Sequence, residues 1–295
     1  MNKITIFGLT FNIDPVAFTL PIGGGWSVYW YGIIIAVGVF SALWYGMKNG
    51  KRFGIEPDAI FDAFVVILPL SILAARAYYI IFDPSSSFKD FFNFSGKGFS
   101  GLAIYGGVIG AAITTFIMHK IKKFSLLAAL DVTSVGFLIG QGIGRWGNFI
   151  NQEAYGTFTG SSWFGMTGGV ISYEMGSDAL VHPCFLYESI WCIAGAFLLH
   201  YFSKKRIFKG QIALMYGAWY GFERTFIELL RTDSLMLGPF RVSSLLSALL
   251  CVTCVTLLIV LIKRKKEDSA EYTPIFANVD NETEEQEVTP AEEEI

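Results

Sequence analysis

The 295-residue chain is 53% hydrophobic and has a mean hydropathy of +0.50, which indicates an integral membrane protein and excludes one or two soluble domains. The net charge of −3 divides into two opposite parts, because residues 267–295 hold eleven acidic and no basic residues. The preceding residues carry all 22 Lys and Arg against 14 acidic residues. The acidic stretch lacks the hydrophobicity to fold, and we predict that 267–295 is a disordered cytoplasmic tail.

Seven apolar runs organise the rest of the chain, after a mixed lead-in over 1–25 that ends in three glycines and is predicted to lie at the membrane interface. Each run approaches or exceeds the roughly 20 residues that cross the hydrocarbon. They cover about 27–47, 58–82, 101–118, 126–149, 184–202, 211–230 and 242–262. Residues 151–183 contain no Lys or Arg and predict a small ordered cap outside the membrane. The predicted fold is an all-α integral membrane domain over 1–266 with seven transmembrane helices and an external cap.

Basic residues distinguish the two sides of this domain. Fourteen Lys and Arg follow the first, third, fifth and seventh runs, whereas the opposite side has only Lys3, Lys89, Lys97 and Arg241. The positive-inside rule therefore predicts an external N-terminus, a cytoplasmic C-terminus and an external position for the end of the fourth run.

The four cysteines fit neither a disulfide framework nor a zinc site. They are Cys184, Cys192, Cys251 and Cys254. The last two form a CxxC inside an apolar run, where we expect small packing residues.

A polar segment, 144–156, closes the fourth run and carries an arginine, two asparagines and a glutamate. An arginine costs roughly 2.5 to 3.5 kcal/mol at the centre of a membrane helix and less near an end, so it should have a partner or a task. If the helix continues, Arg145, Asn148 and Gln152 share one face that suits a phosphate. Glycines at positions 136, 140 and 144 predict a close contact with another helix beside Arg145.

Other charged residues lie in the fifth and sixth runs. Arg224, Glu228 and Arg231 fall on one face and predict ion pairs along the helix. This ladder either fixes packing alone or leaves Arg224 as the free donor. Glu188 is a candidate acceptor for an arginine of the bundle, and His182 is a structural hydrogen-bonding group or, less simply, a base.

Aromatic residues and glycines near the external boundary have two explanations each. Tyr31 and Tyr105 fit an interfacial belt or a ligand site. Gly106, Gly107 and Gly110 allow close approach of a ligand or of a neighbouring helix.

The 144–156 segment resembles the signature of bacterial prolipoprotein diacylglyceryl transferases. The resemblance extends to Trp30-Tyr31-Gly32, Gly101 to Gly107, His182-Pro183 with Leu186-Tyr187-Glu188, and Arg224 with Glu228, Arg231 and Asp233. It implies a seven-span enzyme of the bacterial plasma membrane, with its active site toward the external face. The implied reaction moves the diacylglyceryl group of phosphatidylglycerol onto the lipobox cysteine of a prelipoprotein signal peptide, forming a thioether and releasing glycerol 1-phosphate. The implied partners are that lipid, that peptide and the bilayer, with no cofactor, metal or nucleic acid.

The resemblance also implies roles for individual residues. The predicted catalytic residues are Arg145, Arg224, Asn148, Glu153, Tyr31 and Tyr105. The predicted contacts to phosphatidylglycerol are Arg145, Arg224, Asn148, Gly156 and Arg76. The predicted supporting residues are His182, Glu188, Glu228 and Arg231.

The implied chemistry suits fixed guanidinium groups. A thiol with a pKa near 8.5 must lose its proton to attack, and a desolvated arginine stabilises the departing phosphate. Two such cations also lower the pKa of the thiol. Many family members have histidine where this chain has Tyr105. We therefore predict that this phenol donates a hydrogen bond to the phosphate or orients the lipid, and we leave the base unassigned.

Two other classes compete with the transferase. Buried arginines also mark ion paths, so an anion transporter or channel is the alternative, although we find no second copy of 144–156. A non-catalytic membrane scaffold would leave the polar external face without a reason.

Overall fold

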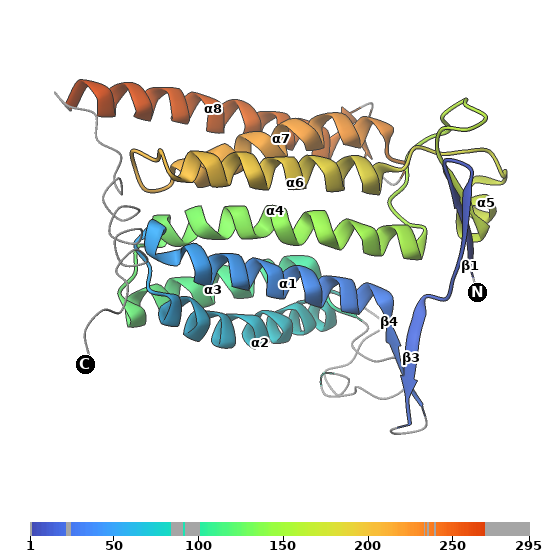
Figure 1. Ribbon diagram of the computed structural model, residues 1–295, viewed down its shortest axis with the longest axis horizontal. Coiled ribbons are helices and arrows are strands. Elements are labelled where there is room, and N and C mark those ends of the chain that lie inside the picture. Colours follow the sequence, from blue (N-terminus) through green and yellow to red (C-terminus); the bar gives the residue numbers. More distant parts are fainter. Residues whose placement is uncertain are drawn as a thin grey trace, which may run out of the picture.

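The computed structural model describes residues 2–21, 25–83, 91, 101–232, 234, 236–238 and 240–268. Its long helices lie side by side along the long axis of the molecule, and a smaller cap lies at one end of this bundle (Figure 1). The long helices are α1 (Trp30–Asn49), α2 (Pro57–Phe82), α3 (Ile104–Lys122), α4 (Leu126–Asn151), α6 (Cys184–Ser203), α7 (Gln211–Leu230) and α8 (Val242–Asp268). A short 3-10 helix, η1 (Gly50–Phe53), follows α1.

Each predicted span forms a helix in the described chain, and six of these helices are long and apolar enough to cross a membrane. The exception is α7, whose 20 residues include Glu223, Arg224 and Glu228. It nevertheless packs closely on α8, since a Cβ atom at Gly217 would lie 2.6 Å from Cys254 Sγ. The protein is therefore a mostly helical multi-pass membrane protein, and α7 as its seventh span stays a prediction.

The glycine stripe of α4 faces α1, which confirms the predicted close helix contact. A Cβ atom at Gly38 would lie 3.1 Å from Gly140 O, so the two backbones cross almost in contact. One turn further, a Cβ atom at Gly144 would lie 3.4 Å from Ile35 Cδ1. Arg145 thus directly follows the segment of α4 that packs tightly against α1.

The glycines of α3 serve helix packing. A Cβ atom at Gly106 would lie 2.5 Å from Ala74 O, and one at Gly110 would lie 2.5 Å from Ala74 Cβ. Gly107 is looser, at 3.6 Å from Ala75 Cβ. Of the two explanations that the sequence left open, a neighbouring helix is the one observed.

The cap combines the predicted segment, 151–183, with the N-terminal residues. Strand β1 (Asn2–Ile6) lies between β2 (Leu9–Ile13) and β5 (Met166–Gly168) in an antiparallel sheet, and α5 (Gly169–Met175) follows β5. Ile4 is fully buried against Met166, Ile171 and Val181 in the cap core. The lead-in, predicted only to border the membrane, thus supplies two of the three strands of this sheet, which the all-α prediction omitted.

Two further hairpins lead into helices. Strands β3 (Val16–Leu20) and β4 (Trp26–Tyr29) precede α1, and β6 (Met236–Leu237) and β7 (Phe240–Arg241) precede α8.

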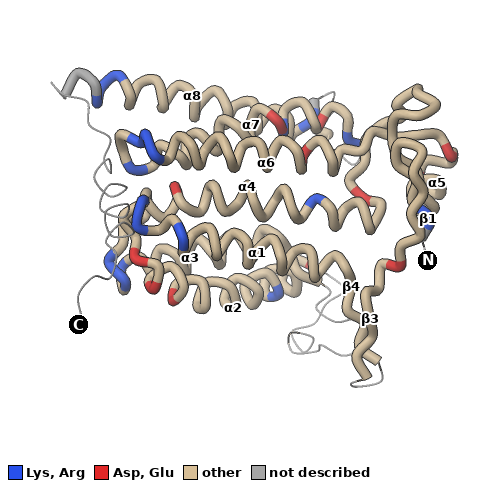
Figure 2. Tube along the Cα trace, viewed as in Figure 1, with Lys and Arg blue, Asp and Glu red and all other residues tan. Residues whose placement is uncertain are grey.

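Charge differs between the ends of the bundle. Figure 2 shows that many Lys and Arg positions gather at the end opposite the cap. The cap and this basic end therefore lie on opposite sides, as the count of basic residues predicted. The direction of insertion in a membrane stays a prediction. Helix α8 continues through residues 267 and 268, the first two of the predicted tail, and Lys89, Lys97 and residues 269–295 lie outside the described residues.

A buried ion pair closes the end opposite the cap. Asp131 of α4 is 0% exposed and accepts a 2.7 Å contact from Arg206, which is 1% exposed and follows α6. The same carboxylate accepts from the backbone N–H groups of Gly210 at 2.8 Å and Ala213 at 3.0 Å. Burial lowers the pKa of the Arg206 guanidinium, and Asp131 opposes that shift. Asp131 therefore caps the start of α7 from a neighbouring helix.

Candidate active site

Arg145 and Glu188 form the centre of the polar cluster at the cap end. Arg145 lies in the last two turns of α4, and Glu188 lies near the start of α6. Arg145 Nη2 makes a close ion pair with Glu188 Oε2. The Glu188 side chain is 2% exposed, whereas that of Arg145 is 22% exposed. The predicted acceptor role of Glu188 is therefore confirmed.

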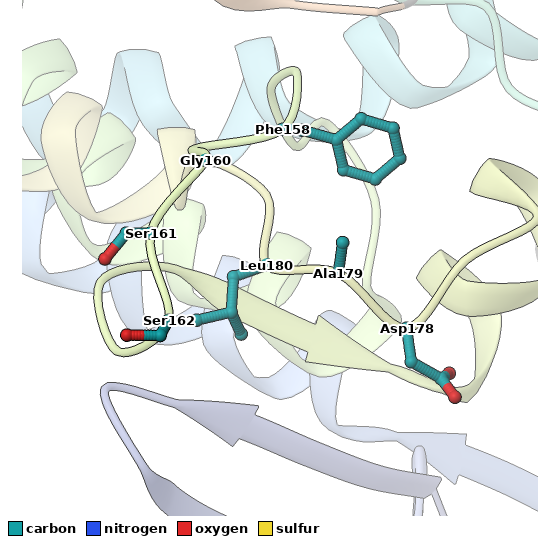
Figure 3. A pocket seen from close by; sticks show the side chains of 7 residues that line it. All are labelled: Phe158, Gly160, Ser161, Ser162, Asp178, Ala179 and Leu180. Carbon is teal, nitrogen blue, oxygen red and sulfur yellow. The ribbon is translucent and has the colours of Figure 1, made fainter.

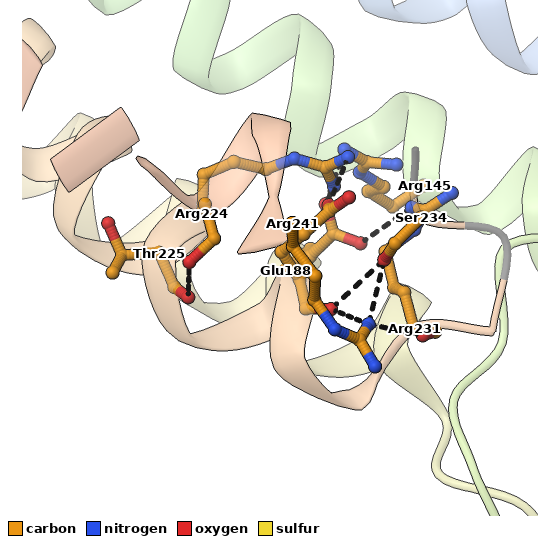
Figure 4. A network of polar contacts seen from close by, with 9 residues as sticks. Arg145, Glu188, Arg224, Thr225, Arg231, Ser234 and Arg241 are labelled. Atoms are coloured by element: carbon orange, nitrogen blue, oxygen red, sulfur yellow. Dashed lines mark hydrogen bonds and ion pairs between the residues drawn. The ribbon is translucent and has the colours of Figure 1, made fainter. Parts of the chain in front are cut away.

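Among the described residues, three arginines approach this one carboxylate. Arg224 Nη1 lies 3.9 Å from Glu188 Oε2, and Arg231 Nη1 lies 3.6 Å from Glu188 Oε1. Arg145 and Arg224 approach Oε2 and Arg231 approaches Oε1, and Figure 4 shows these side chains gathered around Glu188. Their side chains are 22%, 18% and 11% exposed, so each keeps a reachable surface.

The predicted ladder on α7 forms only in part. Arg224 Nη2 pairs with Glu228 Oε2 at 2.7 Å, as the i, i+4 spacing predicted. Arg231 follows the last residue of α7 and turns toward Glu188 instead. The prediction of Arg224 as a free donor is wrong, because it contacts two carboxylates.

Small residues let α4 pack tightly around the cluster. The Tyr31 ring packs directly against Gly147, where a Cβ atom would lie 2.6 Å from Tyr31 Cδ2, so this position requires glycine. Trp146 Nε1 donates to Ser189 Oγ at 3.2 Å, and this hydroxyl donates to Gly142 O at 2.7 Å. These contacts fix α4 against α1 and α6 on either side of Arg145.

Of the three residues on the predicted common face, Arg145 and Asn148 lie in α4, whereas Gln152 turns away from it. Helix α4 ends at Asn151, and Gln152 has a left-handed φ of 55°. Its side chain is buried and accepts from Val170 N at 2.9 Å, so it supports the cap rather than the arginine face. Asn148 Nδ2 donates to Glu153 Oε1 at 2.8 Å, which pairs the two predicted catalytic residues.

Gly156 joins the cap to the end of α7. A Cβ atom there would lie 2.8 Å from His182 Cβ and 3.1 Å from Leu230 O. Gly156 N donates to His182 O at 2.9 Å, and Gly156 also bridges to Arg231. His182 Nδ1 lies 3.2 Å from Tyr187 Oη. These contacts favour a structural role for His182 and explain why position 156 has no side chain.

Arg76 and Tyr105 lie in the α2–α3 pair rather than on the Glu188 cluster. Arg76 Nη1 donates to Gly101 O at 3.1 Å, and its guanidinium lies 5.9 Å from the Tyr79 ring. Tyr105 is 74% exposed, with its ring 6.4 Å from that of Tyr78. Their predicted roles stay predictions, and the predicted signature position Asp233 lies outside the described residues.

A separate cavity of about 420 Å³ lies within the cap (Figure 3). Its lining residues are Phe158, Gly160, Ser161, Ser162, Asp178, Ala179 and Leu180. None of them belongs to the arginine cluster. Across the described chain, no three His, Cys, Asp or Glu side chains gather as metal ligands would.

Arg241 also belongs to the polar network, although it was not among the residues predicted for the site. It precedes α8 and donates to the backbone at the end of α7. Its signal was its isolation as one of four basic residues on the predicted external side. Sequence proximity to Arg231 across a short hairpin could have placed it.

The fold and the cluster together define a multi-pass membrane protein with a cationic site suited to an anionic group. Guanidinium groups present planar forks of donors, and Glu188 holds three of them together.

Comparison with known proteins identifies the family. The model of the prolipoprotein diacylglyceryl transferase family matches residues 15–260. Relatives named phosphatidylglycerol--prolipoprotein diacylglyceryl transferase from Bacillus cytotoxicus and Bacillus cereus strain 03BB102 are each 38% identical over 263 residues. One from Bacillus mycoides is 36% identical, and each alignment covers 88% of this chain and 96% of the relative. The chain belongs to the prolipoprotein diacylglyceryl transferase family and is a transferase.

Proposed function

We propose that the protein transfers the diacylglyceryl group of phosphatidylglycerol to the thiol of the lipobox cysteine of a prelipoprotein. The names of the relatives support the two substrate classes. The single observation that carries the chemistry is the convergence of Arg145, Arg224 and Arg231 on the buried carboxylate of Glu188. Such a cluster keeps guanidinium donors oriented before an anion arrives, which is the condition for electrostatic stabilisation of a leaving group.

The proposed step breaks one bond and forms another. The cysteine sulfur attacks the carbon of the diacylglyceryl unit that carries the phosphate ester. A carbon–sulfur thioether bond forms there as the bond between this carbon and the phosphate oxygen breaks. The electron pair of the broken bond leaves with the phosphate as glycerol 1-phosphate, and the thiol proton passes to that phosphate or to water. Arg145 and Arg224 donate to the phosphate as its charge grows. The positive field of the cluster also favours the thiolate form of the incoming cysteine.

The other predicted residues take supporting or outlying places in this proposal. Arg231 and Glu228 hold Glu188 and Arg224 in position, and His182 and Gly156 hold the cap against α7. Tyr31 and the Asn148–Glu153 pair lie at the cap end of α4, where they can orient the lipid or peptide. Arg76 and Tyr105 would contact a lipid that reaches the α2–α3 pair.

The proposed setting is the bacterial plasma membrane, with the cap and the arginine cluster toward the external face. The gathering of Lys and Arg at the opposite end supports this orientation. The phospholipid would enter laterally between helices.

The proposal is tested with purified protein, phosphatidylglycerol and a lipobox peptide. A mass gain of one diacylglyceryl unit on the peptide is the expected result, and a peptide with serine in place of the acceptor cysteine is the matched control. An unmodified cysteine peptide would refute the transfer. Anion flux across liposomes in the same preparation, without lipidation, would favour the transporter instead.

A further inference from the structure

Arg241 contacts the backbone where α7 ends. Its Nη1 donates to Arg231 O at 2.7 Å and to Ser234 Oγ at 2.8 Å, and it makes a closer hydrogen bond to Glu228 O. Ser234 Oγ donates to the same Glu228 carbonyl at 3.2 Å. Figure 4 shows this guanidinium pointing into the turn that follows α7.

These acceptors are of the kind that a helix end leaves unsatisfied. The last carbonyls of an α-helix have no partner within the helix and carry the negative end of its dipole. A cation at that position is favourable. Arg241 therefore closes α7 from the start of α8, just as Asp131 closes the other end of α7 from α4.

The carbonyls that Arg241 holds belong to two residues of the arginine cluster. Glu228 pairs with Arg224, and Arg231 approaches Glu188. The cap holds the same segment from its other side, because Thr157 N donates to Leu230 O at 2.8 Å. The backbone that carries Arg231 is therefore held by hydrogen bonds from Arg241 and from the cap, and the Arg231 side chain reaches Glu188 from this position.

We propose that Arg241 is a positioning residue for the transfer reaction, acting through Arg231 and Glu228 on the guanidinium groups at Glu188. This inference rests on the proposed function. The Nη1 group of Arg241 donates to acceptors within the protein, namely Glu228 O, Arg231 O and Ser234 Oγ. Loss of Arg241 would release the turn after α7 and let Arg231 leave Glu188.

The test is a double-mutant cycle measured by diacylglyceryl transfer to a lipobox peptide, with kcat and KM for phosphatidylglycerol determined separately. Arg241→Met should lower kcat about tenfold with little change in KM, since small misplacements of catalytic groups cost up to about a hundredfold. Adding Arg241→Met to Arg231→Met should then change the rate by less than about twofold, because the two residues act through one contact. Arg264→Met, the same substitution at the far end of α8, is the matched control and should retain wild-type kcat.

Three results would overturn the inference. They are multiplicative effects in the double variant, wild-type kcat in folded Arg241→Met, and a raised KM alone, which would make Arg241 a lipid contact. If Arg241→Met does not fold, Arg241→Lys is measured in its place. A lysine ammonium can donate to the same carbonyls, so this variant should retain more than about half of kcat. A folded Arg241→Lys protein without activity would contradict the positioning role. Absence of transfer by the wild-type protein would instead refute the proposed function.

Discussion

The ion pairs at the two ends of the helix bundle differ in how far they are buried. At the end opposite the cap, Asp131 and Arg206 are 0% and 1% exposed, and backbone N–H groups occupy both carboxylate oxygens of Asp131. At the cap end, Arg145, Arg224 and Arg231 surround the Glu188 carboxylate and remain 11% to 22% exposed, and Arg224 also pairs with Glu228. The first arrangement is closed to solvent, whereas the second leaves part of each guanidinium exposed.

The difference separates structure from function within one molecule. A matched and desolvated pair has no capacity left for a ligand, and its value lies in fixing helices relative to one another. Guanidinium groups that are held by carboxylates and stay partly exposed can accept a further anion without building a new site. Ion pairs in a membrane protein therefore suggest catalysis or binding where the paired guanidinium groups remain partly exposed.

The largest expected effect is on stability at the closed end. Asp131→Asn leaves Arg206 buried without a compensating charge, and we expect a loss of about 3–5 kcal/mol in the free energy of unfolding. Denaturation of the purified protein in detergent measures it. Asp131→Asn combined with Arg206→Met should recover much of the loss, and transfer per folded molecule should stay near wild type. A specific loss of transfer in the folded double variant would contradict the comparison.

At the cap end the expected effect is on rate. Arg145→Ala removes one donor from the proposed phosphate site, and we expect kcat to fall about 10²- to 10³-fold, as for other charge-stabilising donors. Stability should change less than in Asp131→Asn, because Arg224 and Arg231 still approach Glu188. The rate of lipobox-peptide modification and the unfolding midpoint are measured on the same preparation. A turnover rate equal to that of the wild type would remove Arg145 from the mechanism.

The smallest expected effect concerns Tyr105, outside both ion clusters. If its phenol donates one hydrogen bond to the phosphate, Tyr105→Phe should lower activity about fivefold, the equivalent of about 1 kcal/mol. Tyr105→His tests whether the position can carry the histidine that many family members have. Unchanged activity in Tyr105→Phe would assign the ring to packing against Tyr78.

Sequence predicted the elements whose signal is local. Length and hydropathy gave helices at each predicted span, and glycine spacing predicted the crossing of α1 and α4. The i, i+4 spacing predicted the Arg224–Glu228 pair. Each depends on residues within a few turns of one helix.

The missed features depend on contacts between distant segments. Strand β1 finds its partner β5 more than 150 residues away, and Ile4 gives no sign of that pairing by itself. The course of Gln152 was mispredicted because a left-handed residue ends α4, where its side chain turns to Val170. Arg241 was missed because it donates to backbone carbonyls, which every residue has, so the residue types give no sign of this contact.

Binding of phosphatidylglycerol tests the central claim most directly. Its affinity can be measured for the wild-type protein, for Arg145→Ala and for the Asp131→Asn/Arg206→Met double variant, all shown to be folded. We expect Arg145→Ala to bind at least about tenfold more weakly, because a charge-assisted hydrogen bond contributes about 1.5–3 kcal/mol, and the double variant to bind as the wild type does. Equal affinity in folded Arg145→Ala would contradict the assignment of the arginine cluster to the lipid phosphate.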